Sequence, residues 1–119
     1  MSIATTRPTP NNSTQTAPVS TTAPSATADV DFIDVNTVQA VKWLVTVYDA
    51  TAVKAVAFEV FALHRNGSNP VHTIADKVGD VSINYSVDVV IVGSTMVLQV
   101  TNNEAVNLTI NSTKTVVLL

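Results

Sequence analysis

Apolar and polar residues alternate along much of the chain after residue 29, with the two-residue period of a half-buried β-strand. The clearest case is the run 41–48, in which Val41, Trp43, Val45 and Val47 fall on one face. The region is also rich in Val, Ile and Thr, whose branched side chains fit a pleated surface. These features predict strands, not helices, throughout this part of the chain.

A second long run, residues 53–64, is apolar on both of its faces. One face carries Val56, Phe58, Val60 and Ala62, and the other carries Glu59, Phe61 and Leu63. A single thin core covers only one face of a strand, so we expect the second face to contribute to a subunit interface.

Turn signals separate these runs from several others. Asn-Gly at 66–67 predicts a hairpin, and further turns are expected at 77–80, 93–94, 102–104 and 111–114. The remaining runs are 30–35, 71–76, a bent 81–92, 96–101, 106–110 and 115–119. About eight short strands at this spacing predict an all-β fold, an antiparallel β-sandwich or barrel.

Composition changes sharply near Asp29. The preceding segment consists almost entirely of Ser, Thr, Ala, Pro and Asn, with Arg7 as its only charge. Such a segment buries too little apolar surface to offset the entropy of ordering itself. We therefore expect residues 1–28 to form an extended N-terminal arm, with a reach of roughly 90 Å, and residues 29–119 to form the β-sandwich domain. We expect the arm to bind a surface outside its own domain.

Charge and cysteine content exclude several function classes. The chain has nine acidic and six basic residues, a formal net charge of −3, and a pI near 5.0. It lacks the basic surface that phosphate backbones require, so no nucleic-acid partner is expected. It has no cysteine, which excludes disulfides, thiolate zinc sites and thiol nucleophiles. We expect no signal peptide, no membrane-spanning segment and no membrane partner, because the apolar runs are too short.

His64 and His72 flank the Asn-Gly loop and could face each other across a hairpin, as two ligands of a metal site do. Two ligands are too few, and the neighbouring Arg65 disfavours a cation. We interpret both as surface histidines.

Asp29, Asp31 and Asp34 form a D-x-D-x-x-D cluster, and the first two would share a strand face as oxygen ligands for calcium. The spacing lacks the glycine and terminal glutamate of an EF-hand loop. We interpret the cluster as a solvated boundary between the arm and the domain.

Trp43 and Tyr48 could form a platform for stacking sugars, but their opposite parity sends them to opposite faces of the strand. We therefore predict that Trp43 is a core residue. The chain contains no nucleophile, zinc-binding or phosphate-loop motif. No catalytic, cofactor-binding or metal-binding residue is assigned, and no cofactor is expected.

Three segments carry a resemblance to a known group of proteins. They are V-K-W-L-V-T-V-Y-D-A-T at 41–51, the run 53–64 with its Asn-Gly loop, and M-V-L-Q-V-T-N at 96–102. Over residues 35–119 the chain resembles small β-sandwich domains of tailed-bacteriophage virion proteins, which include capsid decoration or cement proteins and modules of head and tail fibres. The resemblance implies a non-enzymatic structural protein of the virion that acts as an oligomer.

The leading hypothesis is a decoration or cement protein that stabilises the capsid surface. Its arm would bind the major capsid protein or another virion protein by strand addition. We expect a homo-oligomer, and favour a trimer because capsids offer local three-fold positions. The alternative is a tail- or head-fibre module, or a receptor- or carbohydrate-binding tip.

Overall fold

A computed structural model describes residues 15–16 and 20–119 of the chain, and residues 1–14 and 17–19 of the expected arm lie outside the described residues. The described part is all-β, as predicted, and within it no helix is long and apolar enough to cross a membrane. Its nine strands are β1 (Gln15–Thr16), β2 (Ser20–Thr22), β3 (Thr27–Asp34), β4 (Val38–Asp49), β5 (Lys54–Arg65), β6 (Ser68–Gly79), β7 (Tyr85–Val92), β8 (Thr95–Asn102) and β9 (Leu108–Leu118).

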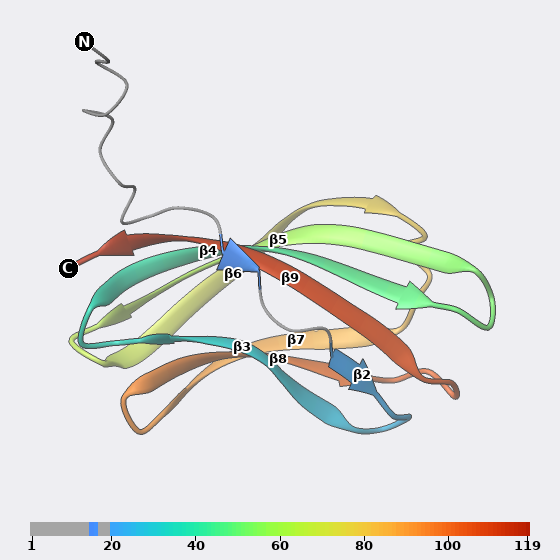
Figure 1. The fold of residues 1–119 in the computed structure, drawn as a ribbon, viewed down its shortest axis with the longest axis horizontal. Helices are drawn as coiled ribbons and strands as arrows, with labels where there is room; N and C mark the ends of the chain where they lie inside the picture. The colour runs from blue at the N-terminus through green and yellow to red at the C-terminus, as the bar shows by residue number, and fades with distance from the viewer. Residues whose placement is uncertain (1–14, 17–19) are drawn as a thin grey trace, which may run out of the picture.

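The strands form two antiparallel sheets that lie one above the other (Figure 1). The larger sheet has the order β1-β9-β4-β5-β6, with β2 also paired to β9, and the smaller sheet has the order β3-β8-β7. Of the two predicted architectures, the structure is therefore the β-sandwich and not the barrel.

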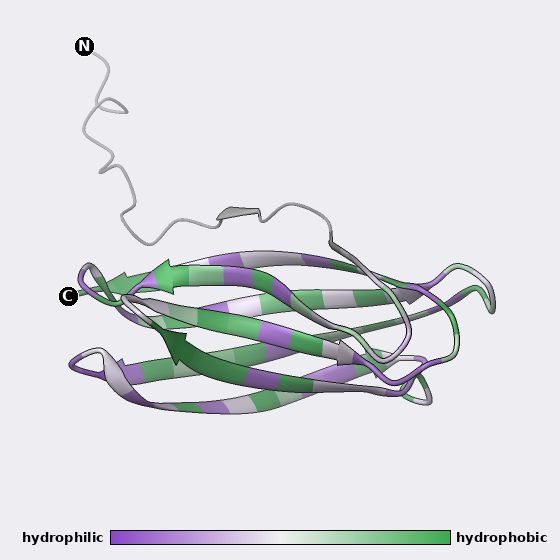
Figure 2. Cartoon of the chain, turned by 90° about the horizontal axis from the view of Figure 1, so that it is seen from below, coloured by the Kyte–Doolittle hydropathy of each residue, from purple (hydrophilic) through white to green (hydrophobic). Residues whose placement is uncertain are grey.

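The core lies between the two sheets and is built from alternate residues of the strands, seen as alternating bands along each strand in Figure 2. Trp43, Val45 and Phe58 of the larger sheet are fully buried, which confirms Trp43 as a core residue. Tyr85 of the smaller sheet stacks on Phe58 with ring centroids 5.2 Å apart. Aromatic stacking adds to simple area burial, so this pair helps to hold the sheets together.

The Asn66-Gly67 hairpin is confirmed. Both residues have positive φ, 51° and 76°, as a two-residue turn that follows the twist of its strands requires. Strand β6 then continues beyond the predicted end at Asp76, because that residue adopts a φ of 55° in a bulge opposite β5. The predicted turn at 77–80 was therefore placed too early.

The predicted turn at 111–114 was wrong, because β9 runs without interruption from Leu108 to Leu118. Its polar residues keep the strand alternation, with Ser112 buried opposite Val45 of β4. Pairing with β4 along almost its whole length holds this polar segment in the sheet.

Residues 20–28, assigned to the arm by composition, form β2 and the start of β3. The buried residue Asn102 fixes this segment. Its side-chain Nδ2 donates a hydrogen bond to the Thr22 carbonyl at 2.9 Å, and its backbone N–H donates one to the Ala26 carbonyl at 2.9 Å. The backbone N–H of Ser25 in turn donates to the Asn102 carbonyl at 2.8 Å. The end of the predicted arm is thus hydrogen-bonded to the sandwich, while an arm function for the preceding residues stays a prediction.

Candidate interaction surface

The structure places the two histidines in different environments. His72 is exposed, as predicted, but the prediction of a surface position was wrong for His64, which is 1% exposed. Its Nδ1 accepts the backbone N–H of Gly67 at 2.8 Å, and its Nε2 lies at 2.5 Å from the carbonyl of Val38. The Gly67 N–H makes Nδ1 the acceptor, so Nε2 carries the proton and donates to Val38. His64 is therefore a structural bridge between β4 and the hairpin.

The three aspartates do not converge. Asp29 accepts a hydrogen bond from Gln99 at 2.9 Å, and Asp34 accepts the backbone N–H of Asn36 at 2.8 Å. A bulge between Asp29 and Asp31 turns Asp31 inward, so the two carboxylates do not share a face. Within the part of the chain that the structure describes, no group of three His, Asp or Glu side chains is placed to hold a metal.

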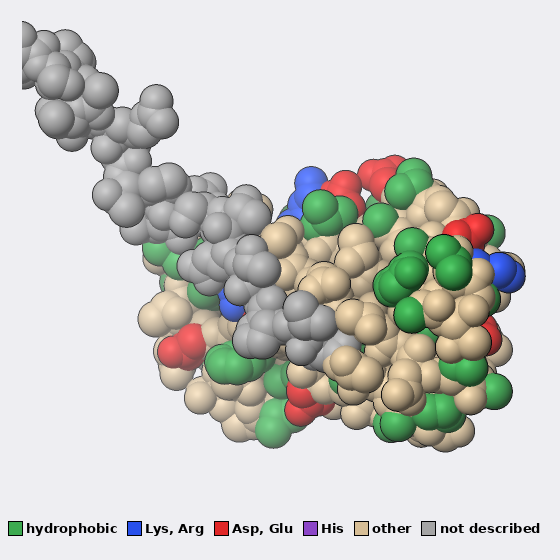
Figure 3. Space-filling view, turned by 45° about the vertical axis from the view of Figure 1, so that its right-hand side comes forward, with side chains coloured by type: hydrophobic (Ala, Val, Ile, Leu, Met, Phe, Trp, Pro, Cys, Tyr) green, Lys and Arg blue, Asp and Glu red, His purple; other side chains and the backbone are tan. Residues whose placement is uncertain are grey.

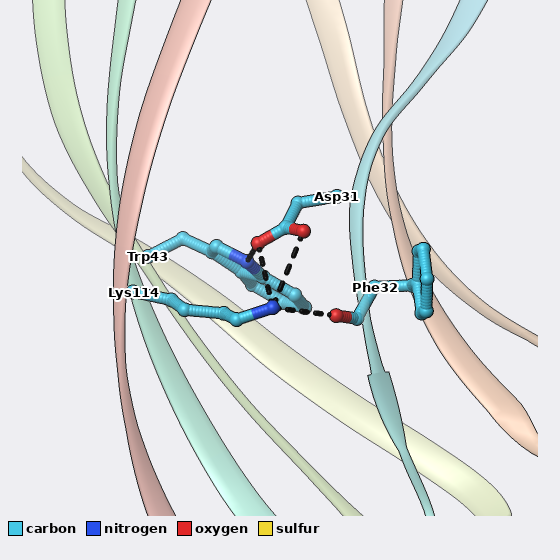
Figure 4. A network of polar contacts seen from close by, with 4 residues as sticks. All are labelled: Asp31, Phe32, Trp43 and Lys114. Carbon is cyan, nitrogen blue, oxygen red and sulfur yellow. Dashed lines mark hydrogen bonds and ion pairs between the residues drawn. The ribbon is translucent and has the colours of Figure 1, made fainter. Parts of the chain in front are cut away.

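The sequence predicted that Asp31 belongs to a solvated boundary, and this was wrong. Asp31 lies in a polar network between the sheets (Figure 4). The Trp43 indole N–H donates to its carboxylate at 3.0 Å, and the Lys114 ammonium lies 3.2 Å from the same oxygen. Lys114 also donates to the carbonyl of Phe32 at 2.8 Å. The Asp31 and Lys114 side chains are only 10% and 15% exposed. This network links β3 of the smaller sheet to β4 and β9 of the larger one.

Among residues 15–16 and 20–119, no layer covers the opposite face of the larger sheet, which carries large apolar side chains. Five of them form what we call the outer patch: Leu44, Phe61, Leu63, Val71 and Val117. Leu44 and Phe61 are 51% exposed, Val117 is 55% and Val71 is 43%, whereas Leu63 is half-buried. Strand register places Leu63, Val71 and Val117 in one row, since Leu63 pairs with Val71 and Ala40 pairs with both Leu63 and Val117. Phe61 and Leu44 lie in the next two rows, opposite Lys42 and Glu59.

Phe61 stands between two shallow hollows of this patch. The first is lined by Phe61, Leu63, Val71 and Thr73 with parts of Ala62 and His72, and the second by Phe61, Lys42, Thr115 and Val117 with part of Val41. Both hollows are mainly apolar. The outer patch is therefore a ridge flanked by two depressions, a relief that suits packing against another apolar surface.

The charged groups within the outer patch neutralise each other. The Lys42 ammonium lies 2.9 Å from the Glu59 carboxylate, on neighbouring strands. The hydrogen bond to Glu59, followed by the charge of Glu59 and a smaller contribution from Asp76, raises the pKa of Lys42. Figure 3 views the sandwich from the side, where charged side chains lie scattered among hydrophobic side chains and the tan of backbone and other side chains.

Comparison with known proteins yields a likeness of fold. No protein-family model matches the chain, and none of the curated proteins is similar to it in sequence. Among solved structures, it is similar to the crystal structure of the Acinetobacter phage vB_ApiP_P1 tailspike protein, with a TM-score of 0.55 and 10% sequence identity. The likeness covers 91% of this chain and 22% of that chain, so the sandwich spans about a fifth of the tailspike's length. At this identity, the comparison shows that this chain shares the fold of that part of the tailspike.

Proposed function

We propose that this chain is a non-enzymatic structural module of a tailed-phage virion. The observation that carries the proposal is the likeness of 91% of the chain to part of a phage tailspike protein. The resemblance of residues 35–119 to virion β-sandwich domains, based on different features, leads to the same class of protein.

The polar groups of the sandwich support a structural role. Two of the side chains considered as metal ligands, Asp31 and His64, are held by partners that stabilise the fold. The exposed aromatic side chains Phe32, Tyr48 and Phe61 lie at separate places on three strands, β3, β4 and β5. They therefore do not form one platform on which a sugar ring could stack. We therefore propose attachment to other virion proteins as the main activity of this module.

Two positions in the virion fit this proposal. The tailspike likeness favours a module of a tailspike or fibre. The sequence resemblance to decoration and cement proteins favours the capsid surface, with the N-terminal segment bound to the major capsid protein. The first position lies on the tail or a fibre and the second on the capsid, so the location of the chain in the particle distinguishes the two roles.

Cryo-electron microscopy of the source particle tests the proposal. Density for the sandwich on capsomers would select the decoration role, and density on the tail would select the spike or fibre role. The proposal fails if mass spectrometry of purified particles does not find the chain. Release of new reducing ends from host surface polysaccharide by the purified chain would contradict the non-enzymatic role.

A further inference from the structure

We propose that the outer patch of the larger sheet is a homotypic interface, covered in solution by the same patch of a second copy of this chain. The two larger sheets would pack face to face about a two-fold axis, so that each copy supplies the same residues. This arrangement replaces the trimer that capsid symmetry favoured. The inference concerns the association of the purified chain and does not depend on its place in a virion.

The first argument is the shape of the patch. Phe61 projects between a hollow beside Leu63 and Val71 and a hollow beside Val117. In a two-fold contact, the Phe61 ring of each copy can enter a hollow of the other. A ridge and a hollow on the same patch are what a self-complementary contact requires.

The second argument is charge. The chain carries a net charge of −3, which opposes association of identical copies over most of the surface. In the outer patch, however, the Lys42 and Glu59 charges cancel. Because the two residues lie on different strands, a two-fold axis between them can bring the lysine of one copy towards the glutamate of the other. The outer patch therefore combines apolar surface with charges that suit a second copy.

The third argument is area. Strands β4, β5 and β6 have 12 residues each and β9 has 11. At roughly 3.3 Å per residue and roughly 4.8 Å between strands, four such strands present a face of roughly 700 Å². A stable interface buries about 800 Å² on each partner, so a contact of that size would use nearly the whole outer face, with the outer patch as its apolar centre.

Sedimentation equilibrium of the full chain with two matched variants tests the proposal. Phe61→Lys places a charge in the outer patch. Val92→Lys is the control, since Val92 is also 57% exposed but belongs to the smaller sheet. We expect the unmodified chain and the Val92→Lys variant to sediment at twice the 12.5 kDa chain mass. Phe61→Lys should weaken association at least tenfold and keep its β-type circular dichroism.

A charge exchange provides a second test if Phe61→Lys fails to fold. Glu59→Lys leaves two positive charges in each patch and should weaken association. The double variant Lys42→Glu with Glu59→Lys restores neutrality and should recover it.

Several results would overturn the proposal. They are a monomeric unmodified chain, a dimer that both the Phe61→Lys and the Val92→Lys variants preserve, and a dimer that Val92→Lys alone disrupts. A trimer would also overturn the two-fold arrangement. If the unmodified chain is monomeric but binds a virion protein through Phe61, the occupant of the patch is that protein and not a second copy.

Discussion

The two faces of the larger sheet are built from alternate residues of the same strands but have different surroundings. On the inner face, Trp43 and Phe58 are fully buried beneath the smaller sheet. On the outer face, Leu44 and Phe61 are about half exposed, although their hydrophobicity is similar. The apolar content of a strand therefore does not by itself distinguish a core face from a binding face. The difference depends on which face another layer covers.

The polar groups of the two faces differ in the same way. On the inner side, Asp31 and Lys114 are enclosed and held by several partners. On the outer face, Lys42 and Glu59 form an ion pair at the surface. Enclosed pairs matter greatly when one partner is removed, whereas exposed pairs contribute little to stability. We therefore expect stability to depend on the inner face and association on the outer face.

The largest effect is expected for Trp43→Ala. Truncating a fully buried aromatic side chain costs about 3–5 kcal/mol, against a typical domain stability of about 5–15 kcal/mol. Trp43→Phe is the matched control, because it keeps most of the apolar volume and loses the hydrogen bond to Asp31. Chemical denaturation should rank Trp43→Ala well below Trp43→Phe. Equal stability of Trp43→Ala and the unmodified chain would contradict the assignment of Trp43 to the core.

The next effect is expected for His64→Leu. This change removes the partner of the buried Val38 carbonyl and of the part-buried Gly67 N–H. A buried group left unpaired costs about 1–3 kcal/mol. The exposed His72 provides the control, since His72→Leu should change stability by no more than about 0.5 kcal/mol. Thermal melting of the two variants measures the contrast. Equal effects would show that the bridge between β4 and the hairpin has no special role.

A somewhat smaller effect is expected for Lys114→Met, which leaves the Asp31 carboxylate without its cation. Removing one member of a fully buried pair costs about 3–5 kcal/mol, and the partial exposure of this pair reduces our expectation to about 2 kcal/mol. Adding Asp31→Asn should recover part of the loss, because the neutral amide still accepts the Trp43 N–H. A double variant less stable than Lys114→Met would contradict this account of the network.

The smallest effect is expected for Glu59→Gln on the outer face. The pKa of Lys42 is raised from 10.5 by Glu59, so it should fall towards that value in the variant. The pair's contribution to stability is present below pH 10.5 and is lost as pH rises through the raised pKa. NMR titration of the lysine side chain measures the shift. An unchanged Lys42 pKa in Glu59→Gln would show that another group causes it.

Several of these features could be predicted from alternation alone. The parity of Trp43 and Tyr48 correctly placed them on opposite faces. The same rule applied to His64 indicates an inward position, because it follows Val60 and Ala62 at steps of two. That signal was present, but the adjacent loop favoured a surface interpretation, which was wrong.

Other features depend on contacts that a strand pattern does not record. The bulge next to Asp31 reverses its direction, so the parity shared with Asp29 was misleading. The pairing of β2 with β9 is made by backbone groups, which leave no hydrophobic signal in a segment of Ser and Thr. The continuity of β9 through residues 111–114 depends on its pairing with β4. In each case a tertiary contact outweighs local preference.

The separation of roles between the two faces is tested most directly by the melting temperature of the full chain as a function of its concentration. Association of folded chains makes this temperature depend on concentration. We predict that it rises between about 1 and about 100 µM for the unmodified chain and for Val92→Lys, whereas for Phe61→Lys the rise begins only at a concentration at least tenfold higher. At the lowest concentration, Phe61→Lys and the unmodified chain should melt at similar temperatures. A melting temperature that is independent of concentration in the unmodified chain, and lower by the same amount at every concentration in Phe61→Lys, would contradict the account.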